Sequence, residues 1–278
     1  MKLITIEELC KAISEREDNL TQDLLLLEQG TSNKEIKNLN LDNSILIKSN
    51  LINCMINDVE VDNCEIINSS FMKNNFADVN FVKNSIRKCS FEDCILGTKR
   101  QSQSTSSTYD QCTFQKCESN GRFVYLDSKF SNCEFIENRM NKAEFSSSSF
   151  YNMTFINNNI TESGFAGSNF IKSQLKDTSL NGGNFKNTNI FNCEILRSSF
   201  SHSDFIDAII NRSKFRYCNF SKMNIENSYI KNTTFFFCDF STVNFKTTRF
   251  SNVKFLGCTL NEKSIDKNEL KNVLIKPM

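Results

Sequence analysis

One feature constrains this chain more than any other: a large apolar residue recurs every five positions from residue 130 to residue 275, with no break in phase. All thirty of these positions carry Phe, Leu, Ile or Met, and we call each of them a centre. Small residues such as Ser, Cys, Ala and Thr dominate the minus-two position, which lies two residues before each centre. Because residues two apart share one face of an extended segment, centre and minus-two side chains point the same way.

A period of five fits neither an α-helix nor a straight strand. It scatters apolar side chains around a helix of 3.6 residues per turn, and it alternates the faces of a strand. The pattern makes sense if the chain bends after every repeat, so that every centre points to a common axis. The chain has only 8 Gly and 1 Pro, so we expect its corners to use a repeated, sterically ordinary conformation.

An earlier run of centres uses a different phase, from Ile36 to Leu96. The polar segment 97–111 follows it without centre spacing and is predicted to be a loop that leaves the coil. The interval from Phe114 to Phe130 is one position longer than three repeats. This excess predicts a one-residue slip near residues 119–126.

Segments such as Ser-Asn-Phe-Ile-Lys (168–172), Ser-Asp-Phe-Ile-Asp (203–207) and Cys-Asn-Phe-Ser-Lys (218–222) resemble the signature of the pentapeptide-repeat family. The resemblance covers most of the chain and implies a right-handed quadrilateral β-helix with four repeats per coil. Cys218, Cys238 and Cys258 support the same count independently, because each follows the previous one after four repeats. We therefore expect an all-β solenoid of about eleven coils over residues 31–278.

Residues 1–30 are predicted to form an N-terminal α-helical cap over the open end of the solenoid. Thr5 and Glu8 fit a capping box. A separate pair of partner-binding helices is the alternative. The apolar stripes that indicate helix are Ile6, Leu9, Cys10 and Ile13, then Leu20, Leu24 and Leu27, ended by Gly30. At the other end, Lys263 and Asn268 at minus-two positions predict that the last coil frays or turns helical.

No residue pattern indicates catalysis, a cofactor or a metal. Of the 12 Cys, only Cys10 lies outside a minus-two position, and no Cys-x-x-Cys pair occurs, so we expect buried, reduced thiols that act as small apolar side chains. His202 is the one His and lies on an outward corner. Phosphate loops, nucleophile elbows and carboxylate motifs are absent from the sequence. We therefore predict that the protein is not an enzyme.

The outward surface carries the strongest functional signal. We number the faces by their centres: face one holds centres 130, 150 and 170, and faces two, three and four begin at 135, 140 and 145. The residue after each centre, the plus-one residue, points to solvent in this fold, yet it is often apolar on faces one and two. Together with an aromatic spot nearby, these residues form the predicted interface: Tyr151, Ile171 and Phe191 after face one; Ile136, Ile156, Leu196, Phe236 and Leu256 after face two; and Tyr217 and Phe237 beside them.

Exposed apolar columns favour a cytoplasmic interaction module that binds another protein or itself. The alternatives are that the 97–111 loop, the terminal cap or a local side-chain cluster covers the columns, or that neighbouring aliphatic residues stack along the coil. Net charge is +1, so direct binding of nucleic acid is not expected, and no signal peptide or membrane span is evident. The resemblance also implies two other functions: a DNA-mimicking protection factor for type II topoisomerases such as gyrase, or a secreted bacterial effector or immunity factor. A DNA mimic should be strongly acidic, whereas residues 127–278 carry 19 basic and 14 acidic residues, a net charge of +5.

Overall fold

A computed structural model describes residues 2–5, 8, 24–27, 30–33, 35–42, 44–52, 54–96, 102–119, 123–265 and 270–276. The chain divides into two compact units, Met1–Glu144 and Phe145–Met278, which we call unit 1 and unit 2. Each unit is an all-β solenoid built from short parallel strands. The two units together hold about eleven coils.

Unit 1 contains three long strands that pass through a corner, and otherwise short strands of two to four residues. Its strands are β1 (Lys2–Leu3), β2 (Leu24–Leu27), β3 (Gly30–Ser32), β4 (Glu35–Asp42), β5 (Ile45–Ile47), β6 (Asn50–Ile52), β7 (Met55–Asp62), β8 (Glu65–Ile67), β9 (Ser70–Met72), β10 (Asn75–Val82), β11 (Ser85–Arg87), β12 (Ser90–Glu92), β13 (Ile95–Leu96), β14 (Ser102–Thr105), β15 (Thr108–Asp110), β16 (Thr113–Gln115), β17 (Phe123–Leu126), β18 (Lys129–Ser131) and β19 (Glu134–Ile136).

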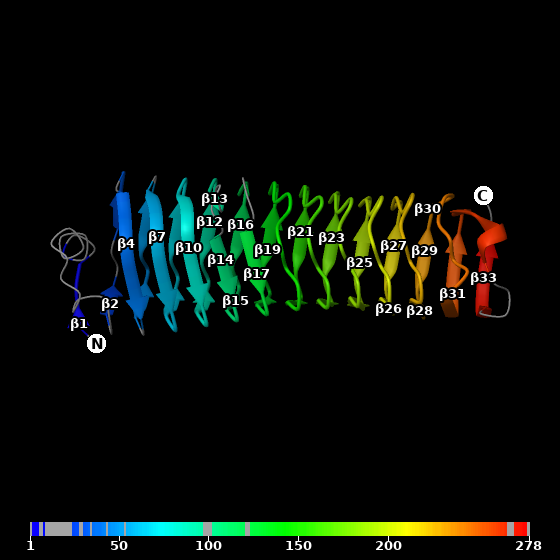
Figure 1. Cartoon of the computed structure of the whole chain (residues 1–278), viewed down its shortest axis with the longest axis horizontal. Coiled ribbons are helices and arrows are strands. Elements are labelled where there is room, and N and C mark those ends of the chain that lie inside the picture. Colours follow the sequence, from blue (N-terminus) through cyan, green and yellow to red (C-terminus); the bar gives the residue numbers. More distant parts are fainter. Residues whose placement is uncertain are drawn as a thin grey trace. The chain divides into compact units, whose positions relative to one another are not determined.

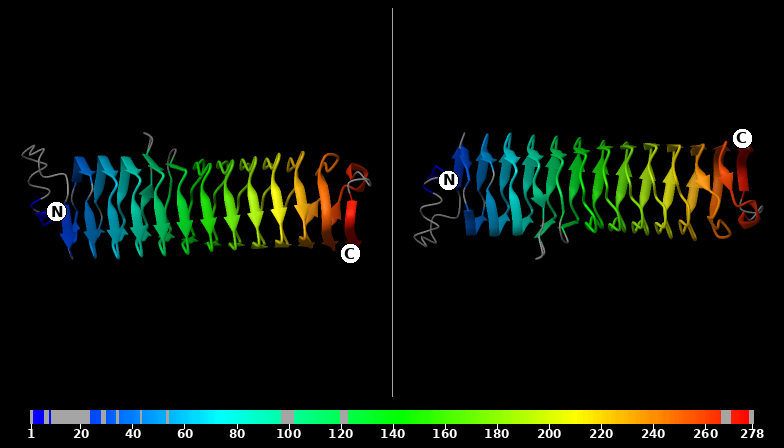
Figure 2. Two further views of the ribbon diagram at one scale, coloured as in Figure 1. Left: turned by 90° about the horizontal axis from the view of Figure 1, so that it is seen from below. Right: turned by 90° about the horizontal axis from the view of Figure 1, so that it is seen from above.

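Unit 2 has the more regular coils. In Figure 1 its labelled strands β21, β23, β25, β27 and β29 lie side by side as successive rungs of face two, and Figure 2 shows these rungs from two further sides. Its elements are β20 (Ser149–Tyr151), β21 (Thr154–Ile156), β22 (Asn169–Ile171), β23 (Gln174–Lys176), β24 (Asn189–Phe191), β25 (Glu194–Leu196), β26 (Ile209–Asn211), β27 (Lys214–Arg216), β28 (Tyr229–Lys231), β29 (Thr234–Phe236), β30 (Asp239–Phe240), β31 (Arg249–Leu256), β32 (Thr259–Leu260), the 3-10 helix η2 (Glu262–Ser264) and β33 (Leu270–Lys276).

The strand register confirms four repeats per coil. In unit 2, Phe150 pairs with Phe170 on face one, and Phe155 pairs with Leu175 on face two. Both steps span four repeats, as the recurrence of the cysteines predicts. Faces three and four of this unit are joined mainly by single bridges such as Asn159 to Ser179 and Gly164 to Asn184. Faces one and two are therefore the more extended parallel sheets.

The corners are not sterically ordinary, and this expectation was wrong. The residue two after each centre, the plus-two residue, adopts a left-handed backbone conformation at corner after corner, as at Asn152 (φ 52), Asn157 (φ 54) and Glu162 (φ 55). L-residues pay for this conformation with a clash between Cβ and the carbonyl oxygen, which Asn and Asp tolerate best. Many of these corners hold Asn, Asp or Lys, so the polar corners take the place of Gly and Pro.

Stacked aromatic rings fill the interior, as the centre pattern predicts. Phe235 stacks on Phe255 with ring centroids 5.1 Å apart, and Phe220 stacks on Phe240 at 4.6 Å. The rings of neighbouring faces meet edge to face, for example Phe235 with Phe240 at 5.1 Å. These Phe residues are at most 1% exposed. Because offset stacks and edge contacts are the favoured aromatic arrangements, the five-residue period builds a dense core.

The minus-two residues do more than leave room for the centres. Their hydroxyl groups hydrogen-bond to the backbone of the adjacent coil: Ser203 Oγ donates to Leu180 O at 2.9 Å, and Gly183 N donates to Ser203 Oγ at 3.2 Å. Cys thiols take the same position and make weaker contacts, such as Cys238 Sγ to Phe215 O at 3.6 Å. The small residues thus satisfy buried backbone groups between coils.

The predicted loop at 97–111 is the clearest correction. Residues 97–101 lie outside the described residues, but residues 102–110 contain β14 and β15, which pair with β10 and β11. Ser104 replaces an apolar centre and is fully buried, because its Oγ hydrogen-bonds to the buried hydroxyl of Tyr109 at 2.9 Å. Tyr125, paired with Ser104 in the next coil and itself buried, fills the space beside the small serine. The segment is polar because this coil has a serine-and-tyrosine interior.

The one-residue slip is confirmed. Within unit 1, Glu118 pairs with Arg139, one position beyond a four-repeat step, whereas Val124 pairs with Glu144 after four repeats. The extra residue therefore enters between Ser119 and Phe123, inside the predicted range. A longer insertion precedes it, since the step from Ser85 to its partner Thr108 also exceeds four repeats.

The helical cap over residues 1–30 is not supported. Leu24–Leu27 is a strand that pairs with β5 and not the second helical stripe, and Gly30 begins strand β3. The capping-box contacts do form, with Thr5 N to Glu8 Oε2 at 2.7 Å and Glu8 N to Thr5 Oγ1 at 3.0 Å. Residues 9–23, which include Leu9, Cys10, Ile13 and Leu20, and also Ile6, lie outside the described residues.

The last coil keeps its phase and turns helical only at η2, whereas residues 270–276 continue as a strand and do not fray as expected. Strand β33 pairs with β31 in a register that sets Phe250 beside Leu270 and Phe255 beside Ile275. Among the described residues of this coil only the short η2 is helical, and there the Oγ of Ser264 accepts a hydrogen bond from Phe245 N at 3.4 Å, much as the minus-two serines do.

Candidate binding surface

The predicted face-two residues of unit 2 form one column. Strand register stacks one residue of each coil on the next. In order along the column these residues are Ile156, Lys176, Leu196, Arg216, Phe236 and Leu256. The four apolar members are half-buried, and the two cations between them are exposed. The column therefore alternates between apolar and cationic side chains before it ends in two apolar residues.

The face-one residues form a second column on the adjacent face. Tyr151 pairs with Ile171, which pairs with Phe191. Tyr151 is 40% exposed, and the other two are half-buried. Ile136 belongs to unit 1, where it is half-buried and pairs with Gln115. Nine of the ten predicted residues thus lie on faces one and two of unit 2.

Three aromatic side chains gather at one edge of face two. The rings of Tyr217 and Phe237 are parallel, with centroids 5.6 Å apart, and the ring of Phe236 meets Phe237 edge to face at 4.4 Å. Tyr217 is 54% exposed and Phe237 is 40% exposed. We call Tyr217, Phe236 and Phe237 the aromatic cluster. It places two aromatic rings in solvent, and their burial would favour binding.

The backbone under this cluster is strained. Tyr217 and Phe237 are plus-two residues with φ of 54° and 47°. Bulky side chains are rare at positive φ, and each such residue costs about 1–2 kcal/mol relative to an ordinary conformation. Among the described plus-two corners they are the only Phe or Tyr. These two corners hold aromatic rings at positive φ and bring no gain in packing inside the core.

Cations lie over several outward aromatic rings. Lys172 Nζ is 5.2 Å from the ring centre of Tyr151 and donates to its hydroxyl at 3.1 Å. Arg212 lies 5.7 Å from the ring of Phe191, and Arg249 lies 5.7 Å from the ring of Tyr229. Lysine and arginine heads are thus held beside aromatic rings on face one.

The charges of unit 2 are divided between its faces, a feature that the sequence reasoning missed. Over residues 149–260, faces one and two carry nine Lys and Arg and two acidic residues, a net charge of +7. Faces three and four carry three Lys and five acidic residues, a net charge of −2. Counting charge by halves of the chain hid the division. Counting charge along the columns, one face at a time, would have revealed it.

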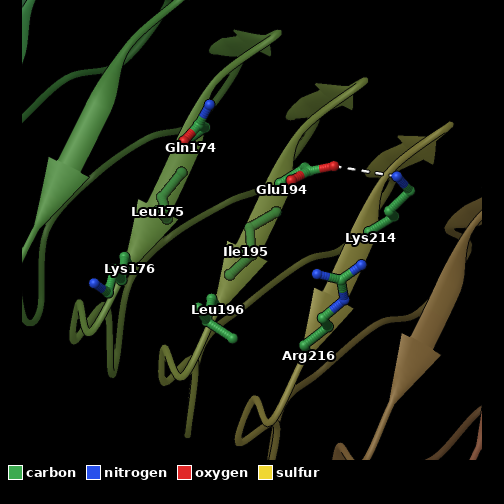
Figure 3. Close-up of a pocket in the computed structure, with 8 residues that line it drawn as sticks. All are labelled: Gln174, Leu175, Lys176, Glu194, Ile195, Leu196, Lys214 and Arg216. Carbon is green, nitrogen blue, oxygen red and sulfur yellow. Dashed lines mark hydrogen bonds and ion pairs between the residues drawn. The ribbon is translucent and has the colours of Figure 1, made fainter.

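A shallow hollow of about 110 Å³ lies on face two, and its lining residues come from β23, β25 and β27. Leu196 lies between Lys176 and Arg216 at the hollow, and Glu194 pairs with Lys214 at 3.1 Å (Figure 3). Lys176 and Arg216 have no ion pair among the described residues. The hollow therefore combines an apolar floor with two exposed cations.

The cysteine side chains are buried as predicted, except at Cys258, the last of the stacked residues Cys218, Cys238 and Cys258. The described cysteines are free, and all except Cys258 are buried. Cys258 is half-buried, and its interactions with the Cys238 side chain and with Cys238 N, which donates to Cys258 Sγ at 3.4 Å, lower the pKa of Cys258 from 9.0 to about 7. Burial raises the pKa of Cys238. Cys258 thus differs from the inert thiol that its minus-two position predicts.

His202 has a partner that the sequence did not indicate. Its Nδ1 lies 2.8 Å from Ser201 Oγ, and the same oxygen lies 3.0 Å from Ser221 Oγ. A general base needs a group that orients it, and in the described part of the chain the side-chain contact of His202 is with a hydroxyl and not with a carboxylate. The described residues also contain no cluster of three His, Cys, Asp or Glu side chains arranged to hold a metal ion. Nor do they include a helix with the length and apolar character to cross a membrane.

Comparison with known proteins agrees with the repeat. Residues 208–278 match the family model of the pentapeptide repeat region, and no curated protein matches the sequence. HetL from the cyanobacterium Nostoc sp. strain PCC 7120, a pentapeptide repeat protein involved in heterocyst differentiation regulation, is similar over 98% of this chain and 92% of its own, with 10% identity and a TM-score of 0.44.

Two further solved structures are similar. QnrB1, a plasmid-mediated fluoroquinolone resistance protein, is similar over 71% of this chain and 93% of its own, with 12% identity and a TM-score of 0.48. An alginate lyase of family PL6 is similar over 96% of this chain and 86% of its own, with 9% identity and the same TM-score of 0.48. Residues 208–278 thus match a pentapeptide repeat region, and the five-residue repeat and four-repeat coils before them follow the same pattern.

Proposed function

We propose that this protein is a non-catalytic binding scaffold, and that it holds a protein partner or a second copy of itself on faces one and two of unit 2. The observation that carries the proposal is the aromatic cluster. Tyr217 and Phe237 occupy strained corners and expose their rings, an arrangement that costs folding free energy and becomes favourable when a partner covers the rings.

The surrounding surface supports the same function. Apolar plus-one residues line two adjacent faces. The same faces also carry Arg, Tyr and Phe residues, which are enriched at protein interfaces. The same faces carry a net charge of +7. This charge disfavours a DNA-mimicking protection factor that uses these faces, because duplex DNA presents dense negative charge.

We also propose a reducing compartment, such as the cytoplasm, for the protein. Its stacked minus-two cysteines are free thiols that hydrogen-bond to the backbone. Free thiols in such number are typical of reducing environments.

The test replaces Phe236 by Ser. Phe236 is half-buried on the outer surface, so the variant should fold while its partner recovery from native lysate, or its self-association in sedimentation velocity, weakens. Ile206→Ser is the matched control, because Ile206 is a half-buried plus-one residue on face four. Equal partner recovery and assembly for both variants and the unaltered protein would contradict the proposal, and an unfolded Phe236→Ser would show that this ring belongs to the core.

A further inference from the structure

The cations on faces one and two of unit 2 are grouped on alternate coils. The coils centred on Phe170, Ile210 and Phe250 carry most of them, and the coils between carry most of the aromatic and large aliphatic groups. The cationic groups are Lys172 with Lys176, then Arg212 with Lys214 and Arg216, then Arg249 with Lys254. The intervening groups are Tyr151 with Ile156, then Phe191 with Leu196, then Tyr229 with Phe236 and Phe237.

Most of this positive charge is not neutralised within the two faces. Their two acidic residues are already paired: Asp177 takes a bidentate contact from Arg197 at 2.7 and 2.8 Å, and Glu194 pairs with Lys214. The other seven cations of faces one and two have no acidic residue on these faces with which to form an ion pair. Like charges repel, so a partner that brings carboxylates to this surface is attracted both at long range and on contact.

The apolar groups between the cations select the class of partner. Along the face-two column only Phe236 carries a ring, whereas Ile156, Leu196 and Leu256 are aliphatic. Single-strand binding stacks successive bases on several rings, and this column does not offer them. Branched aliphatic side chains next to Arg, Tyr and Phe pack well against the apolar stripe of a protein helix. The surface thus suits an acidic protein segment better than a nucleic acid.

The spacing fits a helix that lies along the face-two column. Successive coils lie about 4.8 Å apart, so Lys176 and Arg216, two coils apart, are separated by roughly 10 Å. Residues seven apart on an α-helix are separated by about 10.5 Å. The column from Ile156 to Leu256 spans five coil steps, or roughly 24 Å, which corresponds to a helix of about 16 residues.

We infer that the partner docks an acidic amphipathic helix along the face-two column of unit 2, with carboxylates about seven residues apart on Lys176 and Arg216 and apolar side chains against Leu196 and Phe236. The inference rests on the proposed function and adds the chemistry of the partner. The hollow at Leu196 receives one apolar side chain of this helix, because it lies between the two cations (Figure 3).

The test measures the fluorescence anisotropy of a labelled helical peptide of about 16 residues, with Glu seven residues apart and Leu between. Lys176→Glu with Arg216→Glu should weaken binding about tenfold or more, since attraction becomes repulsion at both sites. Lys222→Glu with Lys246→Glu is the matched control: it makes the same change in net charge at two exposed residues outside faces one and two, and it should change the affinity less than about twofold. Far-UV circular dichroism verifies the fold of both variants.

Three outcomes would overturn the inference: no binding of the peptide, equal weakening by both pairs of substitutions, or tighter binding of a labelled oligothymidine than of the peptide at the same salt concentration. Phe236→Ser separates this inference from the proposed function. Suppose that Phe236→Ser abolishes partner recovery while Lys176→Glu with Arg216→Glu has no effect. The proposed binding surface is then supported, and the inference of an acidic helix is contradicted. If neither change affects partner recovery or peptide binding, both fail.

Discussion

The ring of Phe237 lies so close to the backbone of Gly257 that a Cβ added to Gly257 would stand 2.7 Å from Phe237 Cε1. Gly257 also has φ +62°, a conformation that costs other residues about 1–2 kcal/mol. Gly257→Ala should therefore displace the Phe237 ring from its position against residue 257 and lower the free energy of unfolding by about 1–2 kcal/mol. Chemical denaturation measures the loss, and near-ultraviolet circular dichroism reports the displaced aromatic cluster.

Gly182→Ala is the control for that variant. Gly182 has a similar φ of +67°, but its added Cβ would meet Glu162 Cγ at 3.5 Å, an ordinary contact. The two variants should lose similar stability, and only Gly257→Ala should change the aromatic signal and weaken binding. Identical spectra for the two would mean that Gly257 does not position Phe237.

Removal of one stacked ring from the core should be costly. Phe220 is 1% exposed and lies between Phe200 at 5.4 Å and Phe240 at 4.6 Å. Phe220→Ala leaves a cavity in the stack and should lower the free energy of unfolding by about 3–5 kcal/mol, as measured by urea denaturation. A loss below about 1 kcal/mol would show that the stack closes around the gap or that this centre contributes little.

The stacked thiols should react at different rates. Because the pKa of Cys258 is lowered to about 7, its alkylation by iodoacetamide should rise with a midpoint near pH 7, while buried Cys218 and Cys238 stay unmodified. Mass spectrometry of quenched samples locates the label, and Cys258→Ser should abolish it. Rapid labelling of Cys218 in the folded protein would show that the stacked cysteines are accessible to solvent.

The same shift affects stability with a definite sign. The pKa of Cys258 is lower in the folded state than in the unfolded chain, so its thiolate stabilises the fold above the unfolded pKa near 9, and the contribution is lost as pH falls through about 7. The difference in stability between the unaltered protein and Cys258→Ser should therefore shift in favour of the unaltered protein as pH rises from 7 to 9. A difference that does not change with pH would contradict the lowered pKa.

The interior of the fold was largely predictable because its period is strict. Each centre faces the axis and each minus-two residue accompanies it, so the stacks Phe220–Phe240 and Phe235–Phe255 follow from the spacing alone. The coil at 102–111 escaped prediction because Ser104 holds a centre that Phe or Leu normally holds. Its burial depends on Tyr109 and Tyr125, and a five-residue pattern carries no information about such compensation.

The surface was predictable in part. The alternation along face two follows from positions four repeats apart, and the register confirms that Leu196 lies between Lys176 and Arg216. The contacts at the aromatic cluster could not be foreseen, because they depend on left-handed corners at Tyr217 and Phe237 and on the absence of a side chain at Gly257. Backbone conformation at corners is a property of the folded coil, and the sequence pattern does not encode it separately.

The central claim is that the aromatic cluster serves binding and not folding, and the double variant Tyr217→Asn with Phe237→Asn tests it most directly. Asn tolerates positive φ, so each replacement relieves about 1–2 kcal/mol of strain, which offsets the roughly 1 kcal/mol lost from each aromatic contact. The measurement is the free energy of unfolding of the variant beside that of the unaltered protein. We predict an equal or higher value together with weakened partner binding, whereas a fall of about 3 kcal/mol or more would show that the two rings hold the fold together.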